Sequence, residues 1–345
     1  MKEAVNRVVD AIRKGEKIAV YSDYDCDGIP GGVLLRTFFD DIEYPVEIYV
    51  PHRHNEGYGV HNHAIDALKK KGVSLIITVD LAITNIEEVK YAKSVGVDFI
   101  VTDHHLPITE EVKSKKSKVK RDTTSNYKPV TSNQIVPDAV AVINSKQDVC
   151  KYHDDMLCGC AVAWKLSCAL LSRLREESKA HEAVSRQPSA VSKNKQKGKN
   201  KQSVNAYNNV LKNVLALKDG YEKWLLDLVG ISTISDMVPL VKENRALAHF
   251  GLKVLRQTKR HGLNHIFRTQ GISKDHLTED DIAFTIAPRI NAASRMGDPI
   301  QAHNMLYEKD GVTAQKFVED LESLNTERKL GVKDILGTID FDHSV

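Results

Sequence analysis

Three carboxylates at alternate positions are the first residues of this chain whose spacing could do chemistry. They are Asp23, Asp25 and Asp27, in the segment SDYDCDG. In an extended chain, residues two and four positions apart project to the same face, so these side chains should point the same way. Anions packed together repel strongly unless a cation lies between them. The spacing therefore favours a metal site, although an acidic turn that caps a helix and a calcium loop have similar sequences.

Two later apolar segments also end in polar residues. Asp80 ends the segment ITVD, and Asp103, His104 and His105 end VTDHH. A single Asp at such a place is usually a helix cap and a single His is usually structural, but three segments that end alike favour a shared site. Asp and His ligands without thiolate suit Mn²⁺ best and Mg²⁺ next. Because these residues exceed the needs of one octahedral ion with open positions, we expect two ions that share a carboxylate, as in enzymes that hydrolyse phosphate esters.

The second half of the chain adds candidates of a different kind. Asp236, in GISTISDMVPL, could be another metal ligand or a helix cap. Arg289, Asn291 and Arg295 lie in the segment APRINAASRMGDP. The planar fork of arginine binds phosphate oxygens bidentately, so this segment could hold a phosphodiester of the substrate. A surface role would explain the arginines equally well.

The elements that must position these residues alternate along the first half of the chain. Strands are predicted at 17–25, 46–51, 74–80, 97–105 and 139–144, and helices at 31–42, 63–72 and 85–96. This alternation indicates an α/β fold, a doubly wound parallel sheet with helices on both faces. Open α/β sheets bind ligands outside the carboxyl ends of their strands, which is where the acidic and histidine residues lie.

The chain becomes mainly helical after about residue 157, and two polar stretches interrupt it. Residues 113–127 and 185–203 lack apolar periodicity and are rich in Lys, Ser and Asn. They predict solvated or disordered insertions or, alternatively, arms that attract phosphate. The expected organisation is an α/β core at 1–175, a polar insertion at 176–204, a helical part that completes the catalytic core at 205–317, and the start of a connecting helix at 318–345.

The composition limits the class of protein. Hydrophobic residues make up 41% of the 345 residues and charged residues 28%, which excludes general disorder. The net charge of +3, from 49 basic and 46 acidic residues, argues against histone-like wrapping of nucleic acid but allows a local basic groove. Five cysteines without a disulfide or zinc pattern predict reduced thiols and a cytoplasmic protein. No apolar run approaches the roughly 18 residues of a membrane span, so no membrane partner is expected.

Together these segments resemble the DHH phosphoesterase family, and within it the RecJ-type single-strand-specific exonucleases. DYDCDG, TVD and DHH resemble the family's metal motifs, while GISTISDMVPL and PRINAASRM resemble two further RecJ-type blocks. The resemblance spans about residues 17–325 in the correct order, outside the two polar stretches. Leu81 and Ala82 stand where the family usually has a small residue and glycine, and Ser294 replaces a customary glycine. These departures concern the shape of the loops and leave the ligands intact.

The resemblance implies a role for each candidate residue. It implies metal ligation by Asp23, Asp25, Asp27, Asp80, His104 and Asp236, with Asp80 as the bridge between two Mn²⁺ ions and Mg²⁺ as a weaker substitute. It implies a catalytic group of Asp80, Asp103, His104 and His105, in which His105 polarises the scissile phosphate or donates a proton. Asn291 and Arg295 match positions that face the substrate phosphate, and Arg289 is a further candidate beside them.

The implied function is a two-metal phosphodiesterase that acts as a 5′–3′ single-stranded-DNA exonuclease in DNA repair and recombination. One alternative is another DHH activity, on short oligonucleotides, cyclic dinucleotides or nucleotide phosphates. A second is a non-catalytic nucleic-acid-binding subunit, against which the intact ligand set argues. A helicase or a single-strand-binding protein is a possible partner, and the oligomeric state is open. RecJ-type proteins usually continue into a DHHA1 domain and an OB-fold, so we expect either a fragment or a short form.

Overall fold

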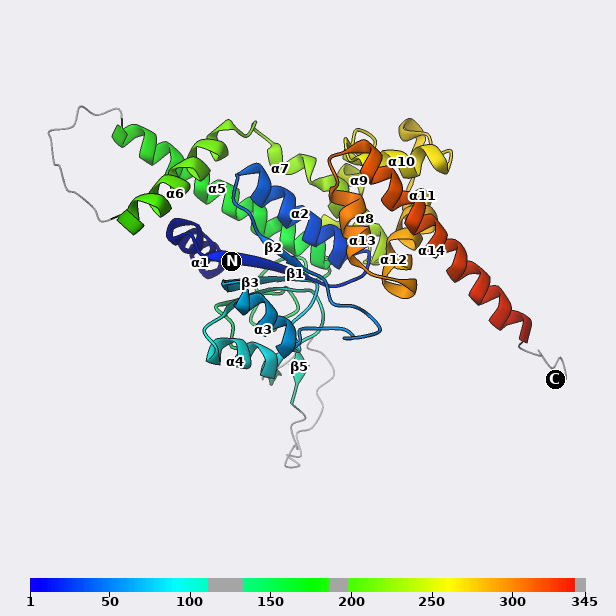
Figure 1. The fold of residues 1–345 in the computed structure, drawn as a ribbon, viewed down its shortest axis with the longest axis horizontal. Helices are drawn as coiled ribbons and strands as arrows, with labels where there is room; N and C mark the ends of the chain where they lie inside the picture. The colour runs from blue at the N-terminus through cyan, green and yellow to red at the C-terminus, as the bar shows by residue number, and fades with distance from the viewer. Residues whose placement is uncertain (111–132, 186–197, 339–345) are drawn as a thin grey trace, which may run out of the picture.

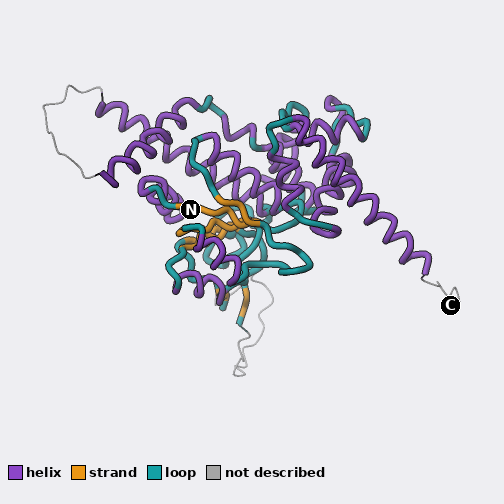
Figure 2. Tube along the Cα trace, viewed as in Figure 1, coloured by secondary structure: helices purple, strands orange, loops and turns teal. Residues whose placement is uncertain are grey.

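A five-stranded parallel sheet forms the centre of the computed structural model, which describes residues 1–110, 133–185 and 198–338. The strand order is β2-β1-β3-β4-β7. The strands are β1 (Lys17–Ser22), β2 (Glu47–Tyr49), β3 (Val73–Val79), β4 (Asp98–Thr102) and β7 (Ala141–Ile143). The short strands β5 (Ile108–Thr109) and β6 (Gln134–Ile135) form a separate antiparallel pair. Figure 2 shows the main sheet enclosed by helices, which confirms the predicted α/β fold class.

Helices cover both faces of the sheet, as a parallel sheet requires. Ile18 and Val20 of β1 lie in a hydrophobic cluster with α1, α2 and α5, whereas Ala19 and Tyr21 lie in a second cluster with α3 and α4. These helices are α1 (Lys2–Lys14), α2 (Gly28–Asp41), α3 (Asn62–Lys70), α4 (Ile86–Ser94) and α5 (Gly159–Ser185). Successive residues of a strand therefore face opposite layers, and almost no polar side chain is tolerated until the strands end.

The strand order creates a crevice beside β1. The chain leaves β1 through α2 on one face to reach β2, then crosses through α3 on the other face to reach β3. Because the connections after β1 and β3 run to opposite faces, they diverge at the carboxyl ends of these two strands. This switch point is where a ligand of a doubly wound sheet is expected.

The second half of the chain packs helices against α2 and α5 (Figure 1). One hydrophobic cluster runs from β1 through α5 to Leu321 of α14, so the described parts share a core. The helices are α6 (Gly198–Ala216), α7 (Tyr221–Trp224), α8 (Leu226–Ser235), α9 (Lys242–Leu255), α10 (His261–Thr269), α11 (Glu279–Asp281), α12 (Ala287–Met296), α13 (Ile300–Tyr307) and α14 (Gly311–Thr338). A 3₁₀ turn (Lys274–His276) precedes α11, and a π-helical turn (Ile282–Ile286) leads into α12.

The structure corrects several predicted boundaries in this half. The polar insertion expected at 176–204 is wrong at both ends, because α5 continues to Ser185 and α6 begins at Gly198. Packing explains the extension, since the hydroxyl of Ser178 is buried and donates to the carbonyl of Leu211 on α6 at 3.0 Å. The connecting helix begins at Gly311 and not at 318. The polar stretch 113–127 lies outside the described residues. In the described part of the chain, no helix has the length and apolar character that crossing a membrane demands.

Candidate metal centre

Three neighbouring strands deliver their terminal polar residues to one edge of the sheet. Asp23 follows β1, Asp80 follows β3, and Asp103 follows β4. The backbone hydrogen bonds of the sheet continue one residue beyond each strand. The N–H of Asp23 donates to the carbonyl of Val79 (3.0 Å), that of Asp80 to the carbonyl of Thr102 (2.9 Å), and that of Asp103 to the carbonyl of Ile143 (3.1 Å). These bonds fix the three residues in a row at the switch point.

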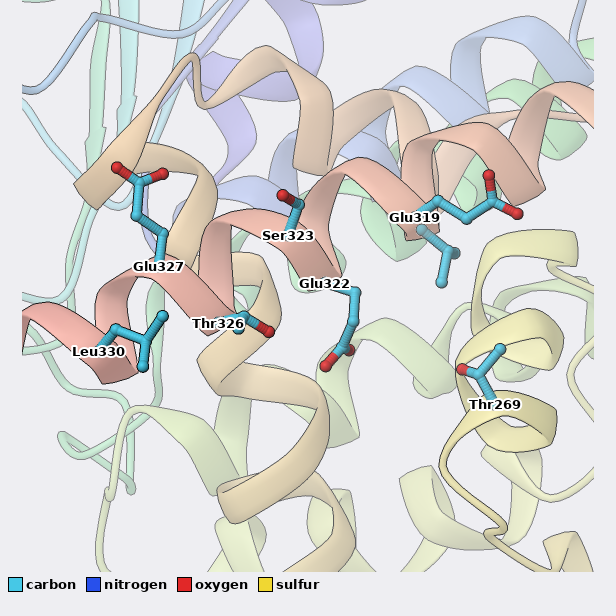
Figure 3. Close-up of a pocket in the computed structure, with 8 residues that line it drawn as sticks. Thr269, Glu319, Glu322, Ser323, Thr326, Glu327 and Leu330 are labelled. Atoms are coloured by element: carbon cyan, nitrogen blue, oxygen red, sulfur yellow. The ribbon is translucent and has the colours of Figure 1, made fainter.

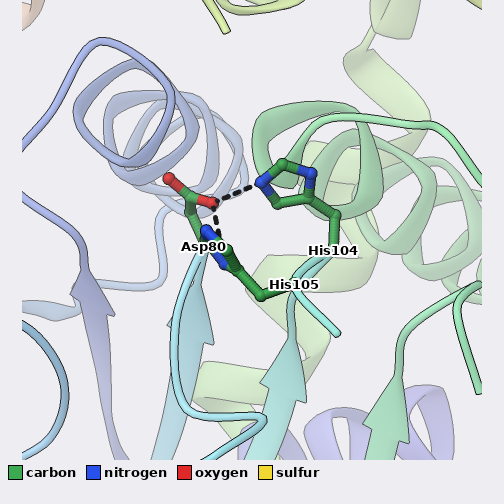
Figure 4. Close-up of side chains that lie close together, drawn as sticks. All are labelled: Asp80, His104 and His105. Atoms are coloured by element: carbon green, nitrogen blue, oxygen red, sulfur yellow. Dashed lines mark ion pairs between the residues drawn. The ribbon is translucent and has the colours of Figure 1, made fainter. Parts of the chain in front are cut away.

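The six predicted ligands gather there in two groups of three. Within each group the ligand atoms lie within 4.8 Å of one another. One group is Asp23, Asp25 and Asp80, and the other is Asp27, His104 and Asp236. The groups adjoin, because Oδ1 of Asp80 lies 3.0 Å from Nε2 of His104. His105 lies beside this pair, with Nδ1 3.8 Å from the same oxygen (Figure 4).

Buried atoms of this cluster lack the hydrogen bonds that burial normally demands. Oδ1 of Asp23, Oδ1 of Asp80 and Nδ1 of His104 are buried and have no hydrogen-bond partner among the described residues. Asp80 is close to Nε2 of His104, but the two atoms are not aligned as a hydrogen bond. Unpaired polar atoms in the interior are rare and costly. The donor set of five carboxylates and one imidazole therefore fits divalent cations.

The electrostatics point the same way. Burial, with the charge of Asp25 second, raises the pKa of the Asp23 carboxyl well above its usual value. Burial and the charge of Asp27 do the same for the pKa of Asp80, and they raise the pKa of Asp236 to about 7. Burial lowers the pKa of His104, which keeps its ring in the neutral form that binds metals. The carboxylates can all ionise together only if positive charge lies among them.

An unusual backbone shapes the loop after β3. Asp80 and Ala82 have positive φ angles of 64° and 91°, in the left-handed region that glycine adopts without strain. Ala82 is the position where the family usually has glycine. Two hydrogen bonds hold the loop, from the Thr78 hydroxyl to the carbonyl of Leu81 (3.0 Å) and from the N–H of Ile83 to Asp103 (2.9 Å). Ala82 therefore adopts a backbone conformation that strains a residue with a side chain, and Asp80 lies within the cluster.

Asp27 joins the cluster to the beginning of α5. Its two carboxylate oxygens accept the N–H groups of Gly159 (2.6 Å) and Cys160 (2.9 Å), the first residues of that helix. Unpaired N–H groups and the helix dipole at an N-terminus stabilise negative charge. Sequence inspection missed this contact, since the two segments lie 132 residues apart.

Asp103 holds the DHH segment together through its hydrogen bonds. Its Oδ1 accepts the backbone N–H groups of His104 (2.7 Å) and His105 (3.1 Å) and lies 2.8 Å from Nδ1 of His105. Burial is the largest single influence and acts to raise the pKa of Asp103, but the hydrogen bond and charge of His105 together with backbone N–H groups outweigh it, and the net shift is downward. The same bond raises the pKa of His105. The half-exposed His105 ring is thereby held in place through Nδ1.

The three predicted substrate-binding residues of α12 separate into different roles. Arg289 is buried, and its Nε and Nη2 pair with the carboxylate of Glu322 on α14 at 2.5 and 3.1 Å. Its Nη1 donates to the carbonyl of Thr285. Each guanidinium nitrogen thus donates one hydrogen bond within the protein, and the phosphate contact of Arg289 stays a prediction. The sequence alone could not reveal a partner on another helix.

The other two residues lie beside the cluster. Oδ1 of Asn291 accepts the N–H of Cys26 at 2.9 Å, which anchors α12 to the loop that carries Asp25 and Asp27. Arg295 is exposed, and its backbone carbonyl lies 2.8 Å from Nε2 of His54. Their contacts with a substrate stay predictions. Tyr58, which sequence reasoning did not single out, donates its hydroxyl to the carbonyl of Asp80 at 3.2 Å and lies 3.2 Å from Nδ1 of His105.

Comparison with known proteins agrees with this geometry. Residues 17–132 match the model of the DHH family, N-terminal domain. This match covers about a third of the chain and includes the segments that carry Asp23, Asp25, Asp27, Asp80, Asp103, His104 and His105. The chain is 32% identical over 329 residues to the single-stranded-DNA-specific exonuclease RecJ of Bacillus subtilis (strain 168), a match that covers 95% of this chain and 33% of that protein. It is 28% identical over 331 residues to the RecJ of Escherichia coli (strain K12), covering 95% of this chain and 48% of that protein.

Solved structures give the same result. A crystal structure of exonuclease RecJ bound to manganese has a TM-score of 0.71 at 27% identity, over 98% of this chain and 68% of that one. RecJ from Thermus thermophilus in complex with Mn²⁺ has a TM-score of 0.68 at 25% identity, over 98% of this chain and 39% of that one. The predicted resemblance to RecJ-type members of the DHH family is confirmed. The chain spans less than half the length of the two curated relatives.

Proposed function

We propose that this chain carries the catalytic site of a metal-dependent phosphodiesterase that removes nucleotides from the end of single-stranded DNA. The observation that carries the proposal is the gathering of six ligand residues in two groups at the switch point, with buried atoms that lack partners. The substrate class follows the RecJ relatives, which are single-stranded-DNA-specific exonucleases. Cleavage from 5′ to 3′ is part of the same proposal.

Two divalent cations would occupy the cluster. Asp23, Asp25 and Asp80 would hold one, and the second group of three would hold the other, with Asp80 as the shared carboxylate. When bound, the pair would supply Lewis acidity that activates a water for attack on phosphorus and neutralises charge on the leaving oxygen. Mn²⁺ should serve better than Mg²⁺, because the imidazole of His104 suits the softer ion.

The residues around the cluster would position the substrate and move a proton. His105, oriented by Asp103, would present Nε2 to a phosphate oxygen and could donate a proton to the leaving group. Arg295 would bind a phosphate at the exposed edge. Asn291 would keep the Asp25–Asp27 loop in place through Cys26, with its amide nitrogen toward the substrate.

The rival activity is hydrolysis of short oligonucleotides, cyclic dinucleotides or nucleotide phosphates by the same site. The likeness to RecJ over nearly the whole chain favours the exonuclease. A helicase or single-strand-binding partner, a cytoplasmic location and a role in repair and recombination remain predictions.

The test combines hydrolysis with metal binding. Purified protein is incubated with Mn²⁺ and with end-labelled single strands, duplexes, short oligonucleotides and cyclic dinucleotides, and calorimetry measures Mn²⁺ binding. Asp80→Asn should abolish hydrolysis and weaken Mn²⁺ binding, while circular dichroism stays unchanged. Asp320→Asn, at an exposed position of α14, is the matched control and should behave as wild type.

Each outcome decides one part of the proposal. Full activity in EDTA would exclude the metal mechanism. Activity of Asp80→Asn within tenfold of wild type would exclude the shared carboxylate. Rapid cleavage of cyclic dinucleotides with intact single strands would favour the rival activity.

A further inference from the structure

One face of α9 carries a row of basic side chains that the metal centre does not use. Lys242, Arg245, His249 and Lys253 follow one another at spacings of three and four residues, so they lie on one side of the helix. All four are exposed. From Lys242 to Lys253 the row extends about 16 Å along the helix axis. We call these four residues, together with Phe250, the α9 stripe.

Acidic side chains are kept away from the stripe. Glu243 is the one acidic residue of α9, and its carboxylate pairs with Lys165 and accepts a hydrogen bond from Tyr152. Asp154, on the loop before α5, turns inward and accepts the N–H of Glu243 at 3.1 Å. Among the ion pairs of the described residues, none involves Lys242, Arg245 or Lys253, whereas Glu243 pairs with Lys165.

An exposed aromatic side chain lies beside this row of basic residues. Phe250 is 51% exposed, an unusual position for a large apolar residue. Nζ of Lys253 lies 5.3 Å from the centre of its ring, and the ring of His249 meets it edge-on at 5.2 Å. Cations interleaved with exposed aromatic rings are the surface on which single-stranded nucleic acids bind, phosphates on the cations and a base on the ring.

The stripe begins beside the metal centre and leads away from it. α8 ends at Ser235 and is capped by Asp236, a member of the metal cluster, and α9 starts at Lys242 after a short turn. The two helices touch at Gly230 and Gly251, where an added Cβ on Gly251 would lie 2.5 Å from the other Cα. A hollow of 370 Å³ on the stripe is lined by Lys242, Arg245, Ala246 and His249.

A second hollow, along α14, has the opposite character. It measures 510 Å³, and Figure 3 shows Glu319, Glu322 and Glu327 among the side chains that line it. A polyanion would be repelled there. The difference in charge favours the α9 side over the α14 side as the place where a strand could leave the site.

We propose that the α9 stripe binds the phosphates and one base of a single nucleic-acid strand whose end lies in the metal centre. This inference rests on the proposed function and adds to it a strand-holding surface outside the catalytic residues. The stripe has no part in hydrolysis itself, so it should matter for long strands and not for short ones.

The test uses the whole chain and a fluorescein-labelled oligothymidylate of about 30 nucleotides. Binding is measured by anisotropy in EDTA, which keeps the probe intact, over a range of KCl concentrations. The variant Lys242→Ala/Arg245→Ala/Lys253→Ala should raise Kd at least about tenfold and flatten the log Kd against log [KCl] slope by about 2, since each phosphate contact contributes about 0.7 on a single strand. Phe250→Ala should raise Kd at least about fivefold with the slope unchanged.

A matched control removes the same charge from the other side of the sheet. Lys69→Ala/Lys70→Ala/Lys90→Ala alters exposed lysines of α3 and α4 and should leave Kd within about twofold of wild type. In Mn²⁺, both triple variants should hydrolyse a trinucleotide at the wild-type rate. Equal Kd and slope for the two triple variants would overturn the stripe even if hydrolysis is normal. If the wild-type protein hydrolyses none of the substrates, yet only the stripe variants bind the oligothymidylate more weakly, the proposed function would be overturned and the proposal for the stripe would be supported.

Discussion

Gly159 lies so close to Asp80 that a Cβ atom on the glycine would be 2.5 Å from Cβ of the aspartate and 2.8 Å from its Oδ1. The N-terminus of α5 is thus in close contact with the carboxylate of Asp80, which lies next to both groups of ligands. At the same place the N–H of Gly159 donates to Asp27. Only a residue without a side chain lets the helix approach this far.

Gly159→Ala should therefore disrupt the metal centre. The added methyl group must displace either Asp80 or the first turn of α5, and we expect hydrolysis to fall at least about a hundredfold because misplacement of the reacting groups by even 1 Å has effects of that size. Overpacking should also lower the free energy of unfolding by roughly 1–3 kcal/mol. Steady-state kinetics and urea unfolding measure the two effects.

Gly331→Ala is the control for this change. Gly331 lies in α14, where an added Cβ meets nothing within 4 Å. Alanine should stabilise the helix slightly and leave the activity unchanged. Equal kinetics for the two alanine variants would show that the close approach at Gly159 does not matter.

Asp103→Asn should separate orientation from metal binding. The asparagine side chain has one carbonyl oxygen fewer to accept hydrogen bonds from the N–H groups of His104 and His105 and from the His105 ring. We therefore expect His105 to lose its orientation and kcat to fall roughly a hundredfold or more, while Mn²⁺ affinity changes little. A buried donor placed against donors should also cost about 1–3 kcal/mol of stability. Calorimetry and single-turnover kinetics check the prediction, and a large loss of Mn²⁺ affinity would show that Asp103 is itself a ligand.

Arg289→Ala should affect mainly stability, and Arg295→Ala mainly substrate binding. Loss of Arg289 leaves Glu322 without its partner, and because that carboxylate is 38% exposed we expect a destabilisation of roughly 1–3 kcal/mol. Loss of the exposed Arg295 should change the stability by less than about 0.5 kcal/mol and raise KM for single strands. Thermal unfolding and kinetics of the two variants, side by side, decide which arginine meets the substrate. A raised KM for Arg289→Ala at unchanged stability would support the predicted phosphate contact of that residue.

His303 should make the fold sensitive to mild acid. Burial, with the charge of Arg36 second, lowers the pKa of this histidine to about 3, against roughly 6.5 in the unfolded chain. Between these values the unfolded state binds one more proton, so the free energy of unfolding falls as the pH drops below about 6.5, by about 1.4 kcal/mol per pH unit. The stability from this group is complete above pH 6.5.

The comparison with His303→Leu isolates this contribution. The variant should lose less stability than wild type between about pH 6.5 and 5, with a difference near 2 kcal/mol in urea unfolding. Because the carboxylate cluster titrates in both proteins, only the difference between them counts. Parallel pH profiles would show that His303 is not neutralised by burial.

The sequence by itself determined the sheet and the ligands of the candidate centre. Strands buried on both faces admit almost no polar residue in their interior, so β1, β3 and β4 each end just before an acidic residue that follows the apolar run. Asp23, Asp80 and Asp103 mark those ends, and the parallel arrangement brings them to one edge. These features can be predicted locally, from apolar segments and the polar residues that directly follow them.

Tertiary structure alone decided what each polar side chain meets. Arginine at 289 and at 295 has the same chemistry, yet packing of α12 against α14 pairs the first with Glu322 and leaves the second exposed. The contact of Asp27 with α5 and the length of α5 beyond residue 176 also depend on partners distant in the sequence. A side chain's role is set by which donors, acceptors and charges the fold places within a few ångströms of it, and no pattern along the chain encodes those distances.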